Sequence, residues 1–172
     1  MTIRGLSCES QPCYDAIVSD RFTYRSDNCS LLRALDLVGE RWTLLVIREA
    51  LLGVRRFDDF VRAIGCARNI LATRLARLAD AGILERVPYR EPGQRARDAY
   101  ALTTSGRELS TAIAALMQWG DRYLADPAGA PLELRHRACG RRVRATLSCA
   151  THGEVTPRDI ALRPGPGAKR TA

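Results

Sequence analysis

The sequence predicts a mainly α-helical domain with one small β-hairpin (α+β), followed by a small ribbon-like module. Apolar residues recur at helical spacing in four segments between residues 28 and 82. Two short β-rich segments flank a Pro92–Gly93 turn, and two cysteine–histidine pairs follow residue 127. The chain has 172 residues, 46% of them hydrophobic, which is enough for one core and an appendage.

The charge of the chain limits the kinds of binding partner to expect. The chain has 27 Lys and Arg against 19 Asp and Glu, a formal net charge of +8. This excess favours a polyanionic partner, either nucleic acid or an anionic membrane surface. No apolar run approaches the length of a membrane span, and the first residues lack the apolar core of a signal peptide. We therefore expect a cytoplasmic protein. Charge alone leaves nucleic acid and a membrane surface open, and the order of elements together with the helix at 67–82 then favours double-stranded DNA and no membrane.

The chain divides into four parts by composition. We expect a flexible N-terminal arm at 1–27, a helical domain at 28–125, a small separate module at 127–162 and a disordered tail at 163–172. The tail is rich in proline and glycine, which is typical of a segment without a fold of its own.

The order of elements in the central part points to a fold. Helices are expected at 28–39, 43–53 with Thr43 as its cap, 58–65, 67–82 and, as one long helix beginning near Thr103, at 103–126. A short extended piece is expected at 54–57, and two strands at 83–89 and 96–102. This order is that of a winged helix-turn-helix, in which the strand pair forms the wing.

The helix at 67–82 has an unusual polar face. At 100° per residue, Leu71, Leu75 and Leu78 fall on one side and polar residues on the other. Arginine suits the acceptors of guanine, asparagine suits adenine, and a threonine methyl can touch thymine. The predicted DNA-binding residues are Arg68, Asn69, Thr73, Arg74 and Arg77 in the major groove, and Arg90, Arg95 and Arg97 in the wing. The alternative is a solvated face made arginine-rich by coding bias, but charge and motif order together favour DNA.

Several motifs carry a family resemblance. The segments "LVGERWTLLVIRE", "RRFDDF", "LATRLARLADAGILER", "YALTTSGREL" and "QWGDRY", with Cys29 ahead of the first helix, resemble the HxlR branch of the MarR-like winged-helix transcriptional regulators. The resemblance spans about residues 28–125. It implies a homodimeric repressor or activator on a pseudo-palindromic operator. Ala67 departs from the pattern, because a polar helix cap is expected there.

The helix expected from Thr103 has more apolar surface than one small core needs, including Leu116, Trp119 and Tyr123. It packs against the first helix of its own chain, or it forms a homodimer through the terminal helices, or both. In a dimer, two recognition helices about one DNA turn apart would read a symmetric site.

Cys29 is a redox-sensing candidate. A helix N-terminus and the nearby Arg33 both stabilise a thiolate at this position. The family resemblance implies the same role, since several members sense oxidants or electrophiles with a cysteine there. The alternative is a half-buried cysteine that only packs. Cys66 is a candidate disulfide partner, although nothing in the sequence brings the two together.

The module at 127–162 carries two matching turns. "HRACG" and "CATHG" each place two ligand-type residues three positions apart before a glycine, which is the zinc-knuckle pattern. The predicted ligands of one structural zinc ion are His136, Cys139, Cys149 and His152. The segment 141–148 between them alternates like a strand. The alternative is a ribbon that keeps the motif without metal.

Other function classes fit less well. An enzyme needs a nucleophile, a general base or an open metal site, and the sequence has no GxSxG, HExxH or phosphate-binding glycine loop. We therefore expect no enzymatic activity. The remaining alternative is a zinc-ribbon protein–protein adaptor with only non-specific DNA affinity. We expect the regulator to respond to a thiol oxidant or to a small molecule.

Overall fold

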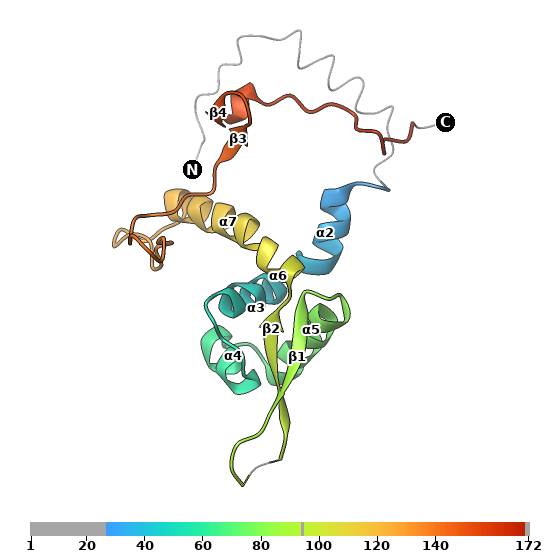
Figure 1. Cartoon of the computed structure of the whole chain (residues 1–172), viewed down its shortest axis with the longest axis vertical. Coiled ribbons are helices and arrows are strands. Elements are labelled where there is room, and N and C mark those ends of the chain that lie inside the picture. The colour runs from blue at the N-terminus through green and yellow to red at the C-terminus, as the bar shows by residue number, and fades with distance from the viewer. Residues whose placement is uncertain (1–26, 94, 171–172) are drawn as a thin grey trace.

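The computed structural model of the chain describes residues 27–93 and 95–170, so the expected N-terminal arm lies, except for residue 27, outside the described residues. The winged domain and its flanking helices consist of α2 (Ser30–Val38), α3 (Arg41–Leu51), α4 (Phe57–Ile64), α5 (Arg68–Asp80), β1 (Leu84–Tyr89), β2 (Arg97–Leu102), α6 (Thr104–Glu108) and α7 (Ser110–Tyr123) (Figure 1). The predicted class, mainly helical with a small two-stranded wing, is confirmed.

The core lies between α3, α4, α5 and the base of the hairpin. Ile47 of α3, Phe60 of α4, and Leu71 and Leu75 of α5 are completely buried. Burial of each such side chain stabilises the fold by about 1.5–3 kcal/mol. The apolar spacing therefore predicted the buried face of α5 correctly.

The wing is an antiparallel pair that projects from the domain (Figure 1). Its register runs from Leu84 opposite Leu102 to Tyr89 opposite Arg97. Thr103 fixes the base of the hairpin, because its N–H donates to the Ile83 carbonyl at 3.1 Å and its hydroxyl caps α6. This fixed base sets the direction in which the wing leaves the core.

Three local predictions are wrong. Helix α3 begins at Arg41, because Glu40 already has the extended backbone of a cap; Thr43 is buried inside the helix instead of capping it. The extended piece at 54–57 is reduced to one bridge, between Arg56 and Ala99. The single long final helix is interrupted at Leu109, a turn residue that ends α6 and precedes the first residue of α7.

Helices α2 and α7 leave the winged domain in different directions (Figure 1). Only Val38 of α2 is buried, whereas Leu31 is 66% exposed and Leu35 is 49% exposed. On α7, Trp119 and Tyr123 are more than half exposed and contact each other with ring centroids 5.5 Å apart. Helix α7 therefore does not cover the leucines of α2 in the same chain.

The described part of the C-terminal extension holds one small hairpin, preceded by an isolated antiparallel bridge between Arg135 and Arg142. Strands β3 (Leu147–Cys149) and β4 (Gly153–Val155) pair antiparallel, and the 3-10 helix η1 (Pro157–Asp159) follows. The strand expected at 141–148 is present only from residue 147, because backbone groups before it bond a side chain of α7. Gln118 donates to the Val143 carbonyl and accepts from the Ala145 N–H, both at 3.1 Å.

The segment after η1 shows no helix or strand between residues 161 and 169, and the Asn28 side chain donates to the Gly167 carbonyl near the start of α2. Among the described residues, none of the helices is both long and apolar enough to cross a membrane.

Candidate nucleic-acid interface

Helix α5 presents a polar face because its other face is anchored in the core. Leu71, Leu75 and Leu78 are each completely buried, which fixes the rotation of the helix about its axis. Asn69 and Thr73 then point to solvent, and the Thr73 hydroxyl donates to the Asn69 carbonyl at 3.0 Å. These two side chains therefore form the centre of the exposed polar face.

The first turn of α5 lies beside α4 and the wing. Arg68 stacks 4.8 Å from the centre of the Phe57 ring and forms an ion pair of 2.8 Å with Asp58. Arg97 of β2 approaches the other oxygen of the same carboxylate at 3.7 Å. Asp58 thus brings together two predicted DNA-binding arginines, one from the recognition helix and one from the wing.

Two other predicted groove residues face a different neighbour. Arg74 and Arg77 both form ion pairs with Glu40, which caps α3, and Arg77 also donates to the Asp36 carbonyl. The side chain of Arg74 is only 19% exposed. In the free protein these two arginines hold α5 to the start of α3, although Arg77 remains 42% exposed. Arg68, Asn69 and Thr73 are exposed and make no ion pair with Glu40.

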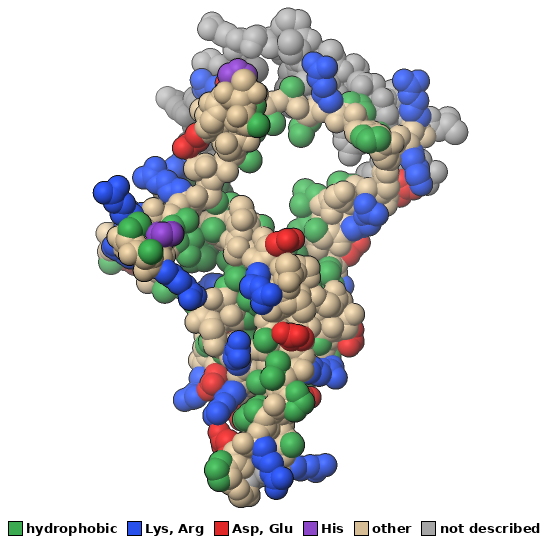
Figure 2. Space-filling view, in the orientation of Figure 1, with side chains coloured by type: hydrophobic (Ala, Val, Ile, Leu, Met, Phe, Trp, Pro, Cys, Tyr) green, Lys and Arg blue, Asp and Glu red, His purple; other side chains and the backbone are tan. Residues whose placement is uncertain are grey.

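The wing carries its arginines on the surface. Arg90, Arg95 and Arg97 are exposed, and Lys and Arg side chains gather at the far end of the wing in Figure 2. Arg56, which the sequence analysis missed, supports this end. It lies 4.9 Å from the Tyr89 ring centre and pairs with Glu91 at 2.6 Å. No pattern in the sequence indicates a contact across 35 residues.

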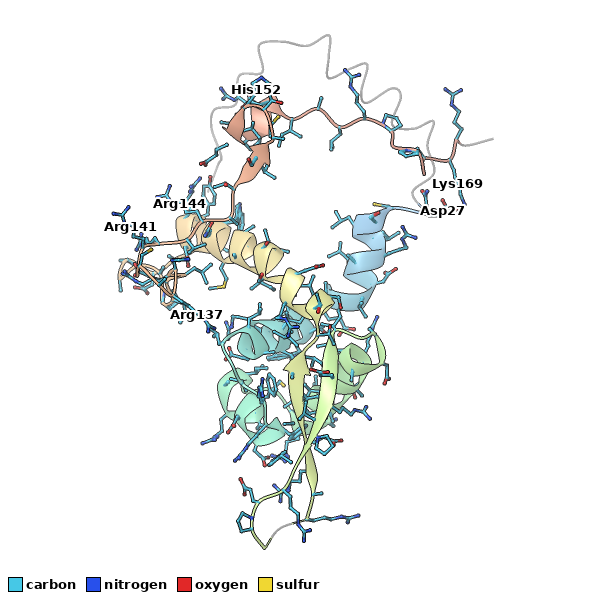
Figure 3. All side chains as sticks on the ribbon, viewed as in Figure 1. Asp27, Arg137, Arg141, Arg144, His152 and Lys169 are labelled. Atoms are coloured by element: carbon cyan, nitrogen blue, oxygen red, sulfur yellow. The ribbon has the colours of Figure 1, made fainter. Side chains whose placement is uncertain are left out.

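The predicted zinc ligands form two separate pairs. His136 Nδ1 lies 3.2 Å from Cys139 Sγ, and Cys149 Sγ lies 3.5 Å from His152 Nδ1. In Figure 3, His152 lies on the β3–β4 hairpin, far from Arg137 and Arg141, which flank Cys139 in the chain. Among residues 27–93 and 95–170, no three His, Cys, Asp or Glu side chains are grouped closely enough to share a metal ion. The structure therefore does not bring the four together.

Each pair nevertheless has the local geometry of a knuckle turn. The glycine after each pair has a left-handed backbone, with φ of +67° at Gly140 and +71° at Gly153. The hydrogen bond from His152 lowers the pKa of the Cys149 thiol, and the backbone N–H groups of Thr151 and His152 lower it further. A turn that stabilises a thiolate suits a soft cation such as zinc.

Cys29, the redox-sensing candidate, is the N-cap residue of α2, half-buried, and its side chain makes no capping hydrogen bond. Cys66 is buried just before α5. Cys8 and Cys13 lie outside the described residues.

A helix anchored on one face, exposed and polar on the other, and flanked by an arginine-bearing hairpin defines a winged-helix DNA-binding protein. The chain belongs to the HxlR-like helix-turn-helix family, which matches residues 37–127. It is therefore a transcriptional regulator and not an enzyme.

The chain is similar to relatives along most of its length. It is 48% identical over 153 residues to the HTH-type transcriptional regulator Rv3095 of Mycobacterium tuberculosis, covering 88% of this chain and 95% of the relative. The crystal structure of PA1607, proposed to be a transcription factor, matches with a TM-score of 0.72 at 31% identity and covers 81% of this chain and 96% of PA1607. The redox regulator HypR in its oxidised form matches with a TM-score of 0.52 at 25% identity, over 57% of this chain and all of HypR.

Proposed function

We propose that the chain is a homodimeric regulator that binds a pseudo-palindromic operator, with Arg68, Asn69 and Thr73 reading the major groove and Arg90, Arg95 and Arg97 holding the DNA backbone. The observation that carries this proposal is the exposed Asn69–Thr73 face beside the Arg68–Asp58–Arg97 cluster. Arg74 and Arg77 reach DNA only if Glu40 releases them.

The test is a fluorescence-anisotropy titration of reduced protein onto the DNA upstream of its own gene, with scrambled DNA as the control. Specific binding about a thousandfold tighter than binding to scrambled DNA supports the proposal. Asn69→Ala should relax discrimination at a base position by roughly 1–3 kcal/mol. Arg95→Ala should weaken binding to both DNAs and reduce the salt slope by about one unit. Equal affinity for both DNAs in the wild-type protein would favour the adaptor function instead.

The exposed leucines of α2 support the dimer. A helix of nine residues is marginal in water without tertiary contacts, and α2 buries only Val38 within its own chain. We therefore expect another apolar surface to pack on the exposed leucines of α2, which are Leu31, Leu32 and Leu35. The exposed apolar side of α7 in a second copy of the chain provides such a surface.

Sedimentation equilibrium tests the dimer. The wild-type chain should sediment as a dimer and Leu32→Glu as a monomer. Leu162→Glu, in the exposed segment after η1, is the matched control and should remain dimeric. A monomeric wild-type chain at micromolar concentration would contradict this part of the proposal.

We also propose that Cys29 makes DNA binding sensitive to oxidants. The support is its place at a helix N-terminus and the likeness of the fold to HypR, a redox regulator. Diamide should change the operator affinity of the wild-type protein and leave that of Cys29→Ser unchanged. An equal response in both proteins would assign the effect to another thiol.

Finally, we propose that His136, Cys139, Cys149 and His152 bind one structural zinc ion, which requires the two knuckle turns to approach each other. The left-handed glycines and the paired thiol and imidazole groups support this. Elemental analysis of the purified chain should find one zinc per chain, and none in Cys139→Ser. Cys29→Ser is the control, and equal zinc contents in these two variants would contradict the proposal.

A further inference from the structure

A cavity of about 500 Å³ lies between α3, α7 and two stretches of the C-terminal extension, residues 132–135 and 143–146. Its volume falls within the range of small-molecule sites, roughly 300–1,000 Å³. It is separate from the DNA-facing side chains of α5 and the wing. No contact of the proposed DNA interface uses it.

The wall of this cavity is built by backbone pairing. The Val143 N–H donates to the Leu134 carbonyl at 2.8 Å, which joins the two stretches of the extension. The Gln118 side chain then joins the stretch 143–146 to α7, because its amide nitrogen donates to the Val143 carbonyl and its amide oxygen accepts from the Ala145 N–H. Leu132 and Val143 remain 40% and 44% exposed, so a ligand has a way in from solvent.

The lining is aliphatic with a cationic edge. The apolar side chains come from leucine, isoleucine, methionine, valine and alanine, and no aromatic ring lines the cavity. Arg135 and Arg142 both bond Glu133, which lowers the pKa of that carboxyl, and Arg48 pairs with Glu49. Arg144 also lines the cavity and makes no ion pair with any described residue. The uncompensated charge at the edge is therefore positive.

The cavity and the proposed dimer surface lie on opposite sides of α7. Ser110, Ala114 and Met117 line the cavity. At 100° per residue, Trp119 and Tyr123 fall on the other side of the helix, where they are exposed. A ligand therefore has access in a dimer as well. Since α3 packs against α5 and α7, a ligand wedged between α3 and α7 is placed to alter how the recognition helix sits relative to the dimer helix.

We propose that this cavity binds a small aliphatic carboxylate, its chain against the apolar lining and its carboxylate on Arg144, and that binding changes the affinity of the regulator for DNA. This inference rests on the proposed DNA-binding function and names its effector class. The extension beyond residue 127, which forms one wall, would then serve as the sensor part of the chain.

Isothermal titration of the full chain with sodium octanoate tests the site, with octan-1-ol as the uncharged probe of the same length and sodium chloride as the ionic-strength control. One octanoate per chain should bind, and octan-1-ol should bind more weakly. Arg144→Gln should weaken octanoate binding roughly tenfold, because hydrogen bonds between two charged groups are the stronger ones. Arg141→Gln, three residues away and outside the cavity lining, is the matched control and should bind like the wild-type chain.

Ala114→Phe fills the cavity and should abolish binding. Equal octanoate affinity in Arg144→Gln and Arg141→Gln, or unchanged binding in Ala114→Phe, would place the ligand on the exposed leucines and overturn the proposal. Octanoate should shift the operator affinity of the wild-type chain and not of Arg144→Gln; binding without such a shift would overturn the effector role. Operator specificity measured without octanoate tests the DNA-binding function separately.

Discussion

Glu40 joins two arginines of the recognition helix to the start of α3, and its removal separates a structural role from a DNA-binding one. Arg74 and Arg77 each reach one oxygen of its carboxylate. The carboxylate and Arg77 are 45% and 42% exposed, so water and salt screen both pairs. At about 0.5 kcal/mol for each partly exposed pair, Glu40→Gln should lower the free energy of unfolding by about 1 kcal/mol.

Thermal unfolding followed by circular dichroism measures this loss. For a chain of 172 residues, 1 kcal/mol corresponds to a fall in Tm of about 2–4 °C, and the fall should shrink in 1 M salt. Non-specific DNA affinity should rise at the same time, because the change removes a negative charge and frees two guanidinium groups. Stability and DNA affinity are thus expected to move in opposite directions.

The matched control is Glu108→Gln, which removes the same charge from an exposed residue of α6 that has no ion pair among the described residues. If both variants lose equal stability, the Glu40 pairs contribute nothing and the assignment of Arg74 and Arg77 as helix-holding residues fails. A double-mutant cycle between Glu40→Gln and Arg74→Ala should give a coupling energy of about 0.5 kcal/mol or more.

Three further predictions concern the winged domain. Gly106→Ala should destabilise the fold strongly, because the added Cβ would clash with the Ile83 carbonyl. At Gly120 in α7 an added Cβ meets no atom, so Gly120→Ala should raise the free energy of unfolding by roughly 0.5–1 kcal/mol. Urea unfolding of the two variants measures the difference. Ala67→Ser should add about 0.5–1 kcal/mol by capping α5, and a lower midpoint in urea would refute this. Leu75→Ala should cost about 2–5 kcal/mol as a cavity in the core, and a cost below 1 kcal/mol would mean that the core does not close around it.

The sequence predicted well what depends on local periodicity. The spacing of Leu71, Leu75 and Leu78 identified both the buried and the exposed face of α5, because one helix axis relates all three. The absence of a polar cap at Ala67 was readable directly from the residue type and is seen in the structure. The wing was found from its β-rich segments and its Pro–Gly turn.

Contacts between distant segments were not predictable in this way. Glu40 forms ion pairs with Arg74 and Arg77, which lie more than thirty residues further along the chain. The helical periodicity of α5 alone shows no such partner and places both arginines on the DNA-facing side. Thr43 was predicted to cap the helix because a threonine hydroxyl is a common N-cap. The helix begins two residues earlier, at Arg41, with Glu40 as its N-cap. Gln118 binds backbone groups of the extension, and no side-chain pattern marks such a contact.

Asp58 has a consequence for how binding depends on salt. Its carboxylate holds the guanidinium groups of Arg68 and Arg97 around one point before any DNA arrives, much as a phosphate would. While Asp58 stays beside these arginines, its negative charge offsets part of their positive charge, so the cluster displaces fewer cations from DNA than two independent arginines would. The count of arginines on the surface therefore overstates the number of ions released, and the salt slope of operator binding should be shallower than that count implies. Asp58 also keeps the two side chains ordered in the free protein, so less conformational entropy is lost when the wing and the recognition helix close on DNA.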